Sequence, residues 1–302
     1  MLYYAKDLRN PPQHPRAAFD QIWRFLDFRQ LVTYPENRSA LVDWRNTFRA
    51  GPPDLAATVA AHFAYKGWLD KKLLVEHALR YCRTMLEDGG FEETALYEAE
   101  RQARPGENYV LLVFGCQGHL VRDYRAAAAF HVLKRLHSVP LKIVFSGHHP
   151  AEPGSKKVVL CLDEARALER EFSRHIDRDP EVAKRHNFTL ALENRSASTQ
   201  ENLANFFAGD YLRDNDSTLF LVSSTFHLPR LAKDAESIIA KDPAAAARVK
   251  RLFLVGSETH PAQDPVALEA NYIKAMLFEV YNHLFQYAPF TVDRPTAYDG
   301  VV

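Results

Sequence analysis

Five short runs of strand-forming residues, separated by helical patterns, constrain the fold of this chain more than any other feature. The first run, at residues 109–114, reads Tyr-Val-Leu-Leu-Val-Phe and ends at a glycine. A short run that is apolar at every position is typical of a strand buried on both faces of a parallel sheet. Similar short runs follow at residues 141–145, 189–193, 218–223 and 251–255.

Helical patterns fill the intervals between these runs. They cover residues 121–136, 162–176, 199–207 and 229–240, and a further helix is expected at residues 268–285. Parallel strands can be joined only by a long crossover, usually a helix, so this alternation predicts a sheet with helices on both faces. We therefore expect an α/β fold with a doubly wound, mainly parallel five-stranded sheet.

The region before the first run has a different character. Helical spacing of apolar residues begins at Phe19 and recurs at residues 74–85 and 92–103, and no strand pattern there is convincing. We expect a helical N-terminal extension at residues 1–106 and an α/β domain at residues 107–302.

Composition limits the class of protein. Lys+Arg and Asp+Glu both number 38, so the formal net charge of +0 gives no long-range attraction to nucleic acid or to an anionic membrane. The three cysteines, Cys82, Cys116 and Cys161, are widely separated and form no CxxC pair, as in a protein of the reduced cytosol. No apolar stretch approaches the roughly 18 residues that cross a bilayer. We expect a soluble, cytoplasmic protein with no nucleic-acid or membrane partner.

Small and polar residues gather just after the strand runs, where open α/β sheets bind their ligands. Gly115 and Gly118 follow the first run, and Ser146 and Gly147 follow the second. Backbone N–H groups at such turns, next to a helix N-terminus, are suited to binding an anion. A tight strand-to-helix turn accounts for the same glycines without a ligand.

Glu193 ends the third run, where a buried carboxylate needs a partner. It is a candidate base or a partner for a ribose hydroxyl, and an ion pair with Arg195 or Arg230 is the structural alternative. Ser198 and Glu201, just after it, have the spacing of a helix capping box.

Residues 225–230, after the fourth run, form the sharpest cluster. His227 is a candidate general acid or base near neutral pH, with a purely structural histidine as the alternative. Arg230 offers a planar fork that binds phosphate or carboxylate. His148 and His149 lie after the second run, but no HxH or HxxxH spacing joins these histidines, so we expect no metal site.

Several short motifs follow one another in a fixed order between residues 109 and 255. They are the glycine turn at Gly115 with a later Arg125, the Ser146-Gly147 strand end with His148 in place of a second glycine, and Glu164-Ala165 at a helix start. They continue with Glu-x-x-Ser-x-x-Thr-x-x-Asn at Glu193, Ser196, Thr199 and Asn202, and with Ser223, Thr225, His227 and Arg230 around His-x-x-Arg. In these motifs the chain resembles the YdcF/SanA/ElyC superfamily of bacterial proteins.

The resemblance implies a Rossmann-like fold with an anion pocket. It favours the YdcF branch, since SanA and ElyC carry a membrane anchor that this sequence lacks. YdcF-like proteins are linked to S-adenosylmethionine binding, and the envelope-anchored relatives to cell-wall precursor metabolism. Gln117 and His148 depart from the family pattern.

We therefore expect an enzyme of group transfer or hydrolysis that binds an anionic, nucleotide-like small molecule, with S-adenosylmethionine as a candidate cofactor. The expected catalytic residues are Glu193 and His227. The expected ligand-binding residues are Gly115, Gln117, Gly118, Arg125, Ser146, Gly147, His148, Glu164, Ser196, Thr199, Asn202, Ser223, Thr225 and Arg230. A noncatalytic binding or sensor protein and a metal-dependent hydrolase stay open as alternatives.

Overall fold

The computed structural model describes residues 3–8, 82–87, 89–102, 107–136, 139–149, 161–212 and 217–257. The chain divides into two units. One comprises Met1–Gln13 with Gly90–Thr259, and the other His14–Gly89 with His260–Val302. In the second unit, residues 82–87 are helical, at the end of the helix predicted for residues 74–85. The helices expected from Phe19 and at residues 268–285 lie outside the described residues.

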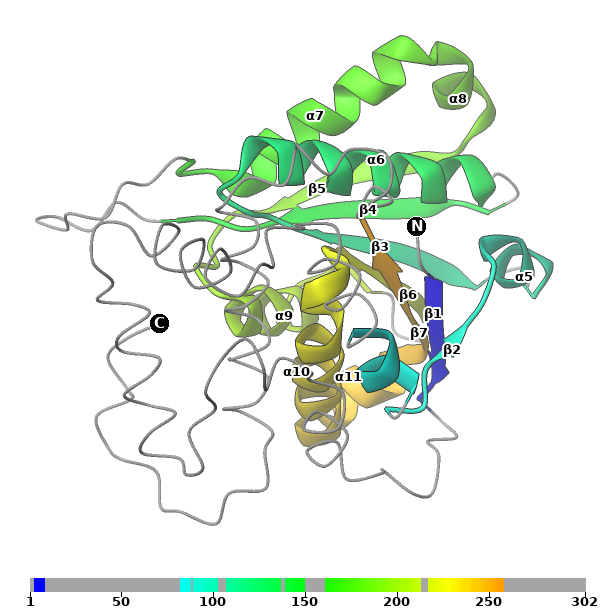
Figure 1. The fold of residues 1–302 in the computed structure, drawn as a ribbon, viewed down its shortest axis with the longest axis vertical. Helices are drawn as coiled ribbons and strands as arrows, with labels where there is room; N and C mark the ends of the chain where they lie inside the picture. The colour runs from blue at the N-terminus through cyan, green and yellow to red at the C-terminus, as the bar shows by residue number, and fades with distance from the viewer. Residues whose placement is uncertain are drawn as a thin grey trace, which may run out of the picture. The chain divides into compact units, whose positions relative to one another are not determined.

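A seven-stranded sheet forms the framework of the first unit (Figure 1), in the order β2-β1-β7-β6-β3-β4-β5. Its strands are β1 (Tyr3–Asp7), β2 (Glu92–Glu93), β3 (Asn108–Phe114), β4 (Leu141–Ser146), β5 (Phe188–Glu193), β6 (Ser217–Ser223) and β7 (Val249–Gly256). The last five are the strands predicted from the sequence, and neighbours among them pair in parallel. Counted along the chain, these five lie in the order 3-2-1-4-5, which is consistent with a Rossmann-like α/β fold.

The prediction of a five-stranded sheet was wrong, because two antiparallel strands extend it. β1 pairs with β7, and β2 pairs with β1, both antiparallel. Neither strand is a continuous apolar run, so neither gave the sequence signal of a strand buried on both faces. The helix predicted for residues 92–103 is also shorter, since its first residues form β2 and helix α5 spans only Leu96–Arg101. These elements precede residue 107, and the domain boundary expected there stays a prediction.

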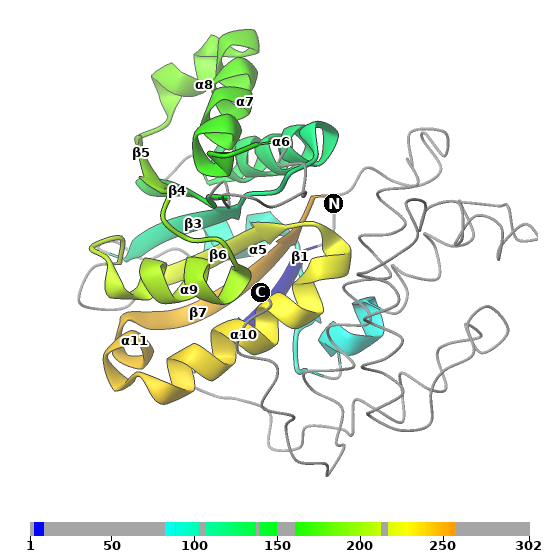
Figure 2. The same cartoon turned by 90° about the vertical axis from the view of Figure 1, so that its left-hand side faces the viewer.

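Helices lie on both faces of the sheet (Figures 1 and 2). α6 (His119–Arg135) and α7 (Glu164–Arg178) cover one face, and α9 (Thr199–Ala208) and α10 (Leu228–Lys241) cover the other. Shorter elements complete the connections, namely α8 (Pro180–Arg185), the 3₁₀ turn η2 (Thr225–His227) and α11 (Pro243–Arg248). Within the described part of the chain, no helix has both the length and the apolar character that a membrane crossing requires.

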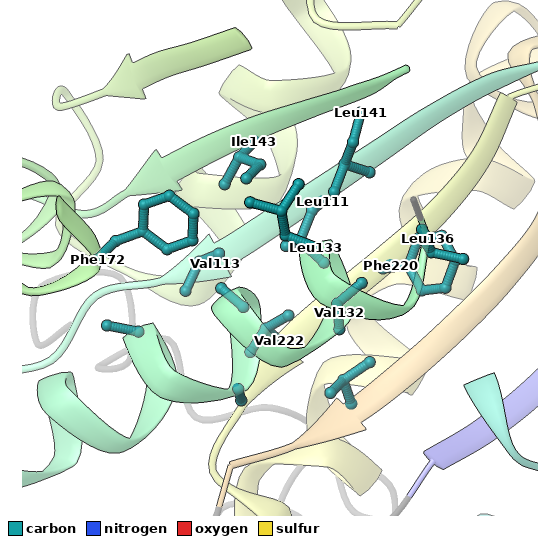
Figure 3. Packing of buried hydrophobic residues seen from close by; sticks show 14 of the residues in the cluster. Leu111, Val113, Val132, Leu133, Leu136, Leu141, Ile143, Phe172, Phe220 and Val222 are labelled. Carbon is teal, nitrogen blue, oxygen red and sulfur yellow. The ribbon is translucent and has the colours of Figure 1, made fainter. Parts of the chain in front are cut away.

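The core on the α6/α7 side is built by alternate strand residues (Figure 3). Leu111 and Val113 point to this side, because side chains alternate along a strand. The fully buried Phe172 of α7 packs there, with its ring centroid 5.4 Å from that of Phe145 on β4. The apolar strands therefore form the centre of the unit and leave polar side chains at the strand ends.

A partly buried ion pair lies at the amino ends of the strands. Arg251 Nη2 on β7 lies 2.7 Å from both carboxylate oxygens of Glu107, just before β3. The Tyr109 hydroxyl donates to the same carboxylate at 2.6 Å, and the Thr218 hydroxyl at 3.4 Å. The charges at this edge are thus satisfied by the protein itself.

We expect Phe172→Ala to lower the free energy of unfolding by about 3–5 kcal/mol, because it leaves a cavity between α7 and the sheet. The exposed Leu162→Ala is the control and should change stability by less than about 0.5 kcal/mol. Urea denaturation followed by circular dichroism measures both. Equal stabilities for the two variants would contradict this description of the core.

Candidate functional site

Two glycines at the carboxyl ends of β3 and β4 make room for Glu164, the first residue of α7. A Cβ at Gly115 would lie 2.6 Å from Glu164 Cβ, and one at Gly147 would lie 2.8 Å from Glu164 Oε2. Gly147 also has a φ of +134°, which side-chain-bearing residues rarely adopt. The Gly115 N–H donates to Ser146 O at 2.6 Å and the Gly147 N–H to Glu193 O at 2.9 Å. These two N–H groups bond within the protein, so the glycines supply close packing here.

Gln117 connects the end of β3 to the start of α7. Its Nε2 donates to Glu164 Oε1 and to the carbonyl of Cys161 at 2.8 Å, and its Oε1 accepts the Cys161 N–H at 3.0 Å.

Burial raises the pKa of the neighbouring Cys116 thiol, against the opposing effect of the Arg125 charge. Cys116 is therefore held as a neutral thiol rather than a reactive thiolate.

Arg125, on α6, joins the ends of β3 and β6. Its Nη1 donates to Phe114 O at 2.8 Å and Gly115 O at 2.7 Å, and its Nε and Nη2 donate to Ser224 Oγ at 3.3 and 2.9 Å. The side chain is buried, and these bonds occupy most of its donors. Arg125 thus braces two adjacent strand ends, and its predicted contact with a ligand stays a prediction.

Glu193 is buried at the end of β5 and has partners there. The Ser146 hydroxyl donates to its Oε2 at 2.8 Å, and the Arg195 N–H donates to its Oε1 at 3.1 Å. The exposed guanidinium of Arg195 is 4.0 Å away, at the outer limit of an ion pair. The carboxylate is therefore held mainly by hydrogen bonds across the ends of β4 and β5.

His227, the last residue of η2, is the centre of a second cluster. Its Nδ1 lies 2.7 Å from Ser223 Oγ on β6. Its Nε2 lies 3.0 Å from Arg230 Nη2 on α10 and 3.3 Å from Thr199 Oγ1 at the start of α9. Arg230 is in turn 3.5 Å from the buried Asp234 carboxylate, one helical turn further on. The sequence motifs around Thr199 and His227, which are far apart in the chain, thus meet in space.

The start of α9 confirms Ser198 as the N-cap and Glu201 as the residue that reaches back. Ser198 Oγ accepts the Glu201 N–H at 3.2 Å, and Glu201 Oε2 accepts the N–H of Ala197, one residue before the N-cap, at 2.7 Å. The two side chains therefore bond backbone groups of their own segment.

The other predicted residues of this edge have packing roles in the structure. Ser196 Oγ accepts from Asn205 Nδ2 at 2.8 Å, and the Ser196 carbonyl accepts the His148 N–H at 2.7 Å. Thr225 is buried and begins η2, with its carbonyl accepting the Leu228 N–H. Their predicted contacts with a ligand are not tested by these bonds.

Asn202 stands apart from these satisfied groups. It lies on α9, one turn after Thr199, and its side chain is 7% exposed. Among the residues that the structure describes, no donor reaches its Oδ1. Most buried polar atoms have a partner, so an unbonded amide oxygen on the helix that carries Thr199 is suited to a donor from a ligand.

The two clusters do not converge on one point. β4 and β3 separate β5 from β6, so the backbones at Glu193 and Ser223 lie roughly 14 Å apart by ordinary strand spacing. A ligand that touches both must be extended along the edge of the sheet.

The helices that follow the strands differ at their N-termini. α7 and α9 are capped by the side chains of Asp163 and Ser198, and each has a glutamate in its first turn. α6 and α10, whose N-cap residues are Gly118 and His227, have no side-chain cap and no acidic residue in the first turn. These two follow β3 and β6, the adjacent strands between which the chain order reverses. The two uncapped helix ends therefore flank the place where such folds bind ligands.

Sequence reasoning missed four residues of this edge: Arg122, Ser224, Asp234 and Ser257. Buried Arg122 donates to the carbonyls of Cys116 and Gln117 at 2.9 and 2.7 Å, which shapes the turn before α6. Asp234 had a visible signal, since it follows Arg230 by four residues on a helix. Ser224 and Ser257 were visible only as polar residues that follow a strand, because their partners, Arg125 and the Ser223 carbonyl that accepts the Ser257 N–H at 3.0 Å, lie on other elements.

Comparisons with known proteins find no match to this chain among protein-family models, curated proteins or solved structures. Within the described ranges, no group of three or more histidine, cysteine or acidic side chains is arranged to hold a metal ion. Fold and site together define an α/β protein with polar clusters along the carboxyl edge of its sheet. The particular ligand and reaction are the subject of the proposal below.

We expect Gly147→Ala to lower the free energy of unfolding by at least about 1–3 kcal/mol, because alanine is strained at this φ and its methyl group meets Glu164. Gly118→Ala is the matched control. Its added Cβ would be 3.6 Å from the nearest atom and its φ is −76°, so the loss should stay below about 1 kcal/mol. Chemical denaturation of both variants checks the difference, and a well-tolerated Gly147→Ala would contradict the packing described for Glu164.

Proposed function

We propose that this chain is a Rossmann-like protein of the YdcF type that binds an anionic, nucleotide-like small molecule at the carboxyl ends of β3 and β6. We further propose that it is an enzyme of group transfer or hydrolysis, with S-adenosylmethionine as a candidate cofactor.

The observation that carries the proposal is the pair of uncapped helices at the strand-order reversal. The N-terminus of an α-helix carries a partial positive charge and free N–H groups. Asp163 and Ser198 each accept one N–H at the start of α7 and α9, whereas α6 and α10 have no such side chain. An anionic group would find free N–H groups at the start of α6; at α10, where Thr225 O accepts the Leu228 N–H and Pro229 has none, it would gain from the helix dipole.

Arg230 adds a second reason to expect an anion. It is the third residue of α10, where a cation is unfavourable next to the positive end of the helix. Asp234 is its nearby counter-charge, and the guanidinium also lies against His227 and Thr199. A phosphate or carboxylate here would gain from the guanidinium and the helix end together.

The span of the site indicates the size of the ligand. The anion subsite lies at Arg230, while the amide oxygen of Asn202, which no donor among the described residues reaches, offers an acceptor for a hydroxyl or amino group. Hydroxyl groups of a ribose next to a charged group meet both requirements. A nucleotide has this combination, and S-adenosylmethionine has it with a carboxylate as its anionic group.

We expect ligands of this class to raise the melting temperature of the protein, since binding to the native state alone stabilises it. The probes are ATP, AMP, S-adenosylmethionine, a nucleotide sugar and inorganic phosphate, each measured by differential scanning fluorimetry. Arg230→Ala should abolish the shift, and Arg166→Ala, an exposed arginine on α7, should preserve it. A shift that survives in Arg230→Ala would place the ligand elsewhere, and no shift from any probe would overturn the nucleotide-like proposal.

A noncatalytic binding or sensor protein is the second candidate, and one observation favours it. Glu193 and His227 have separate partners and belong to strands separated by two others, so they are not positioned as one acid–base pair. Incubation with each stabilising probe, followed by product analysis, distinguishes the two candidates. Turnover that is lost in His227→Ala supports the enzyme, and tight binding without turnover supports the sensor.

We expect Asn202→Ala to weaken ligand binding about tenfold or more without destabilising the free protein, because the amide oxygen has no partner to lose. Asn205→Ala, on the same helix, is the matched control. Its amide donates to Ser196, so its loss should cost about 1 kcal/mol of stability and leave affinity unchanged. Denaturation curves, together with titration of the stabilising probe, measure both quantities. Loss of stability in Asn202→Ala would show that its amide has a structural role.

A further inference from the structure

His227 lies between two groups that together fix the position of its ring proton. Arg230 Nη2 is 3.0 Å from Nε2, and Ser223 Oγ is 2.7 Å from Nδ1. A guanidinium nitrogen donates hydrogen bonds and accepts none, so Nε2 must present its lone pair to Arg230. The proton of the neutral ring then lies on Nδ1, where the Ser223 hydroxyl oxygen accepts it.

The other protonation states conflict with the same contacts. A proton on Nε2 would face a second donor at 3.0 Å, and an imidazolium would place a cation against the guanidinium. The Thr199 hydroxyl, 3.3 Å from Nε2, can donate or accept and is compatible with each form. Arg230 is thus the group that decides between them.

We propose that the protein holds His227 as the neutral imidazole protonated on Nδ1, which makes Nε2 the proton acceptor of the anion site. The tautomer follows from these contacts, whereas the role of Nε2 as a proton acceptor for a ligand rests on the proposed function. Arg230 then has two roles, because it binds the anion and keeps Nε2 unprotonated. Ser223 is a positioning residue, and its full burial and its contact with Nδ1 exclude it as an exposed nucleophile.

The assignment gives His227 the role of a base in the first step. When a bound anion takes the Arg230 N–H, the Nε2 lone pair faces the ligand. An O–H group of the ligand, or of a water next to it, transfers its proton to Nε2 and leaves an alkoxide or hydroxide as the nucleophile. The ring becomes an imidazolium that still donates from Nδ1 to Ser223, and the anion on Arg230 balances the added charge.

The test is histidine-selective ¹⁵N NMR of the ligand-free protein at neutral pH, in which the shifts of the two ring nitrogens report the tautomer. We expect Nδ1 of His227 to be protonated and Nε2 not. His175 is an internal control with the opposite tautomer or a charged ring, because its Nε2 lies 3.1 Å from the Asp123 carboxylate, which only accepts. His227→Gln and His175→Gln identify the two rings in the spectrum.

Variants at Arg230 and Ser223 test whether these two residues set the tautomer of His227. Arg230→Ala should allow a population protonated on Nε2 that donates to Thr199, while Arg195→Ala, whose guanidinium lies at the end of β5, should leave the tautomer unchanged. Ser223→Ala should speed the exchange of the Nδ1 proton with water about tenfold, through loss of its acceptor.

A wild-type ring protonated on Nε2 or on both nitrogens would overturn the proposal, as would an unchanged tautomer in Arg230→Ala. The measurement needs no ligand, so its outcome is independent of the stabilisation screen. The expected tautomer without any stabilising ligand would overturn the proposed function alone.

Discussion

Burial of five parallel strands on both faces is the constraint on which the rest of this unit depends. Apolar side chains fill both sides of the sheet, so polar groups that must lie near its centre are confined to the strand ends. The amino edge uses this confinement for stability, with Glu107 satisfied by Arg251 and two hydroxyl groups. Buried polar atoms to which no described residue bonds occur at both edges, Arg251 Nε at the amino edge and the Asn202 amide oxygen at the carboxyl edge. The edges differ in their helix ends, because the helices that follow the parallel strands begin at the carboxyl edge.

The central fold could be predicted from the sequence because its signal is local. The runs that became β3 to β7 and the four long helices between them were found within two residues at each end. β1 and β2 were missed because edge strands need no continuous apolar run, and their pairing partners lie far along the chain.

In the candidate site, too, only contacts between residues close in sequence could be predicted. The spacing of Ser198 and Glu201 gave the cap directly, whereas the brace between Arg125 and Ser224 depends on two adjacent strands that are remote in sequence.

The helix caps are distributed unevenly, which accords with the proposed binding site. Side chains that cap a helix contribute about 1 kcal/mol each, and two of the four long helices have them. The two that lack them begin near Arg125 and Arg230, and Asp234 offsets the charge of Arg230. Sequences commonly depart from locally optimal choices at functional sites.

The tight packing of Glu164 against Gly115 and Gly147 limits how this protein can diverge. A side chain at either glycine would overlap atoms of Glu164, and at Gly115 it would also lie 2.8 Å from the Ser146 carbonyl oxygen, so a smaller residue at position 164 relieves only part of the overlap. Position 147 carries a second restriction, because its backbone conformation disfavours any residue with a Cβ. Mutations at the three positions are therefore expected to be epistatic, with effects that depend on the order in which they arise. A change of the turns after β3 and β4 therefore requires a substitution at position 164 together with a movement of the backbone.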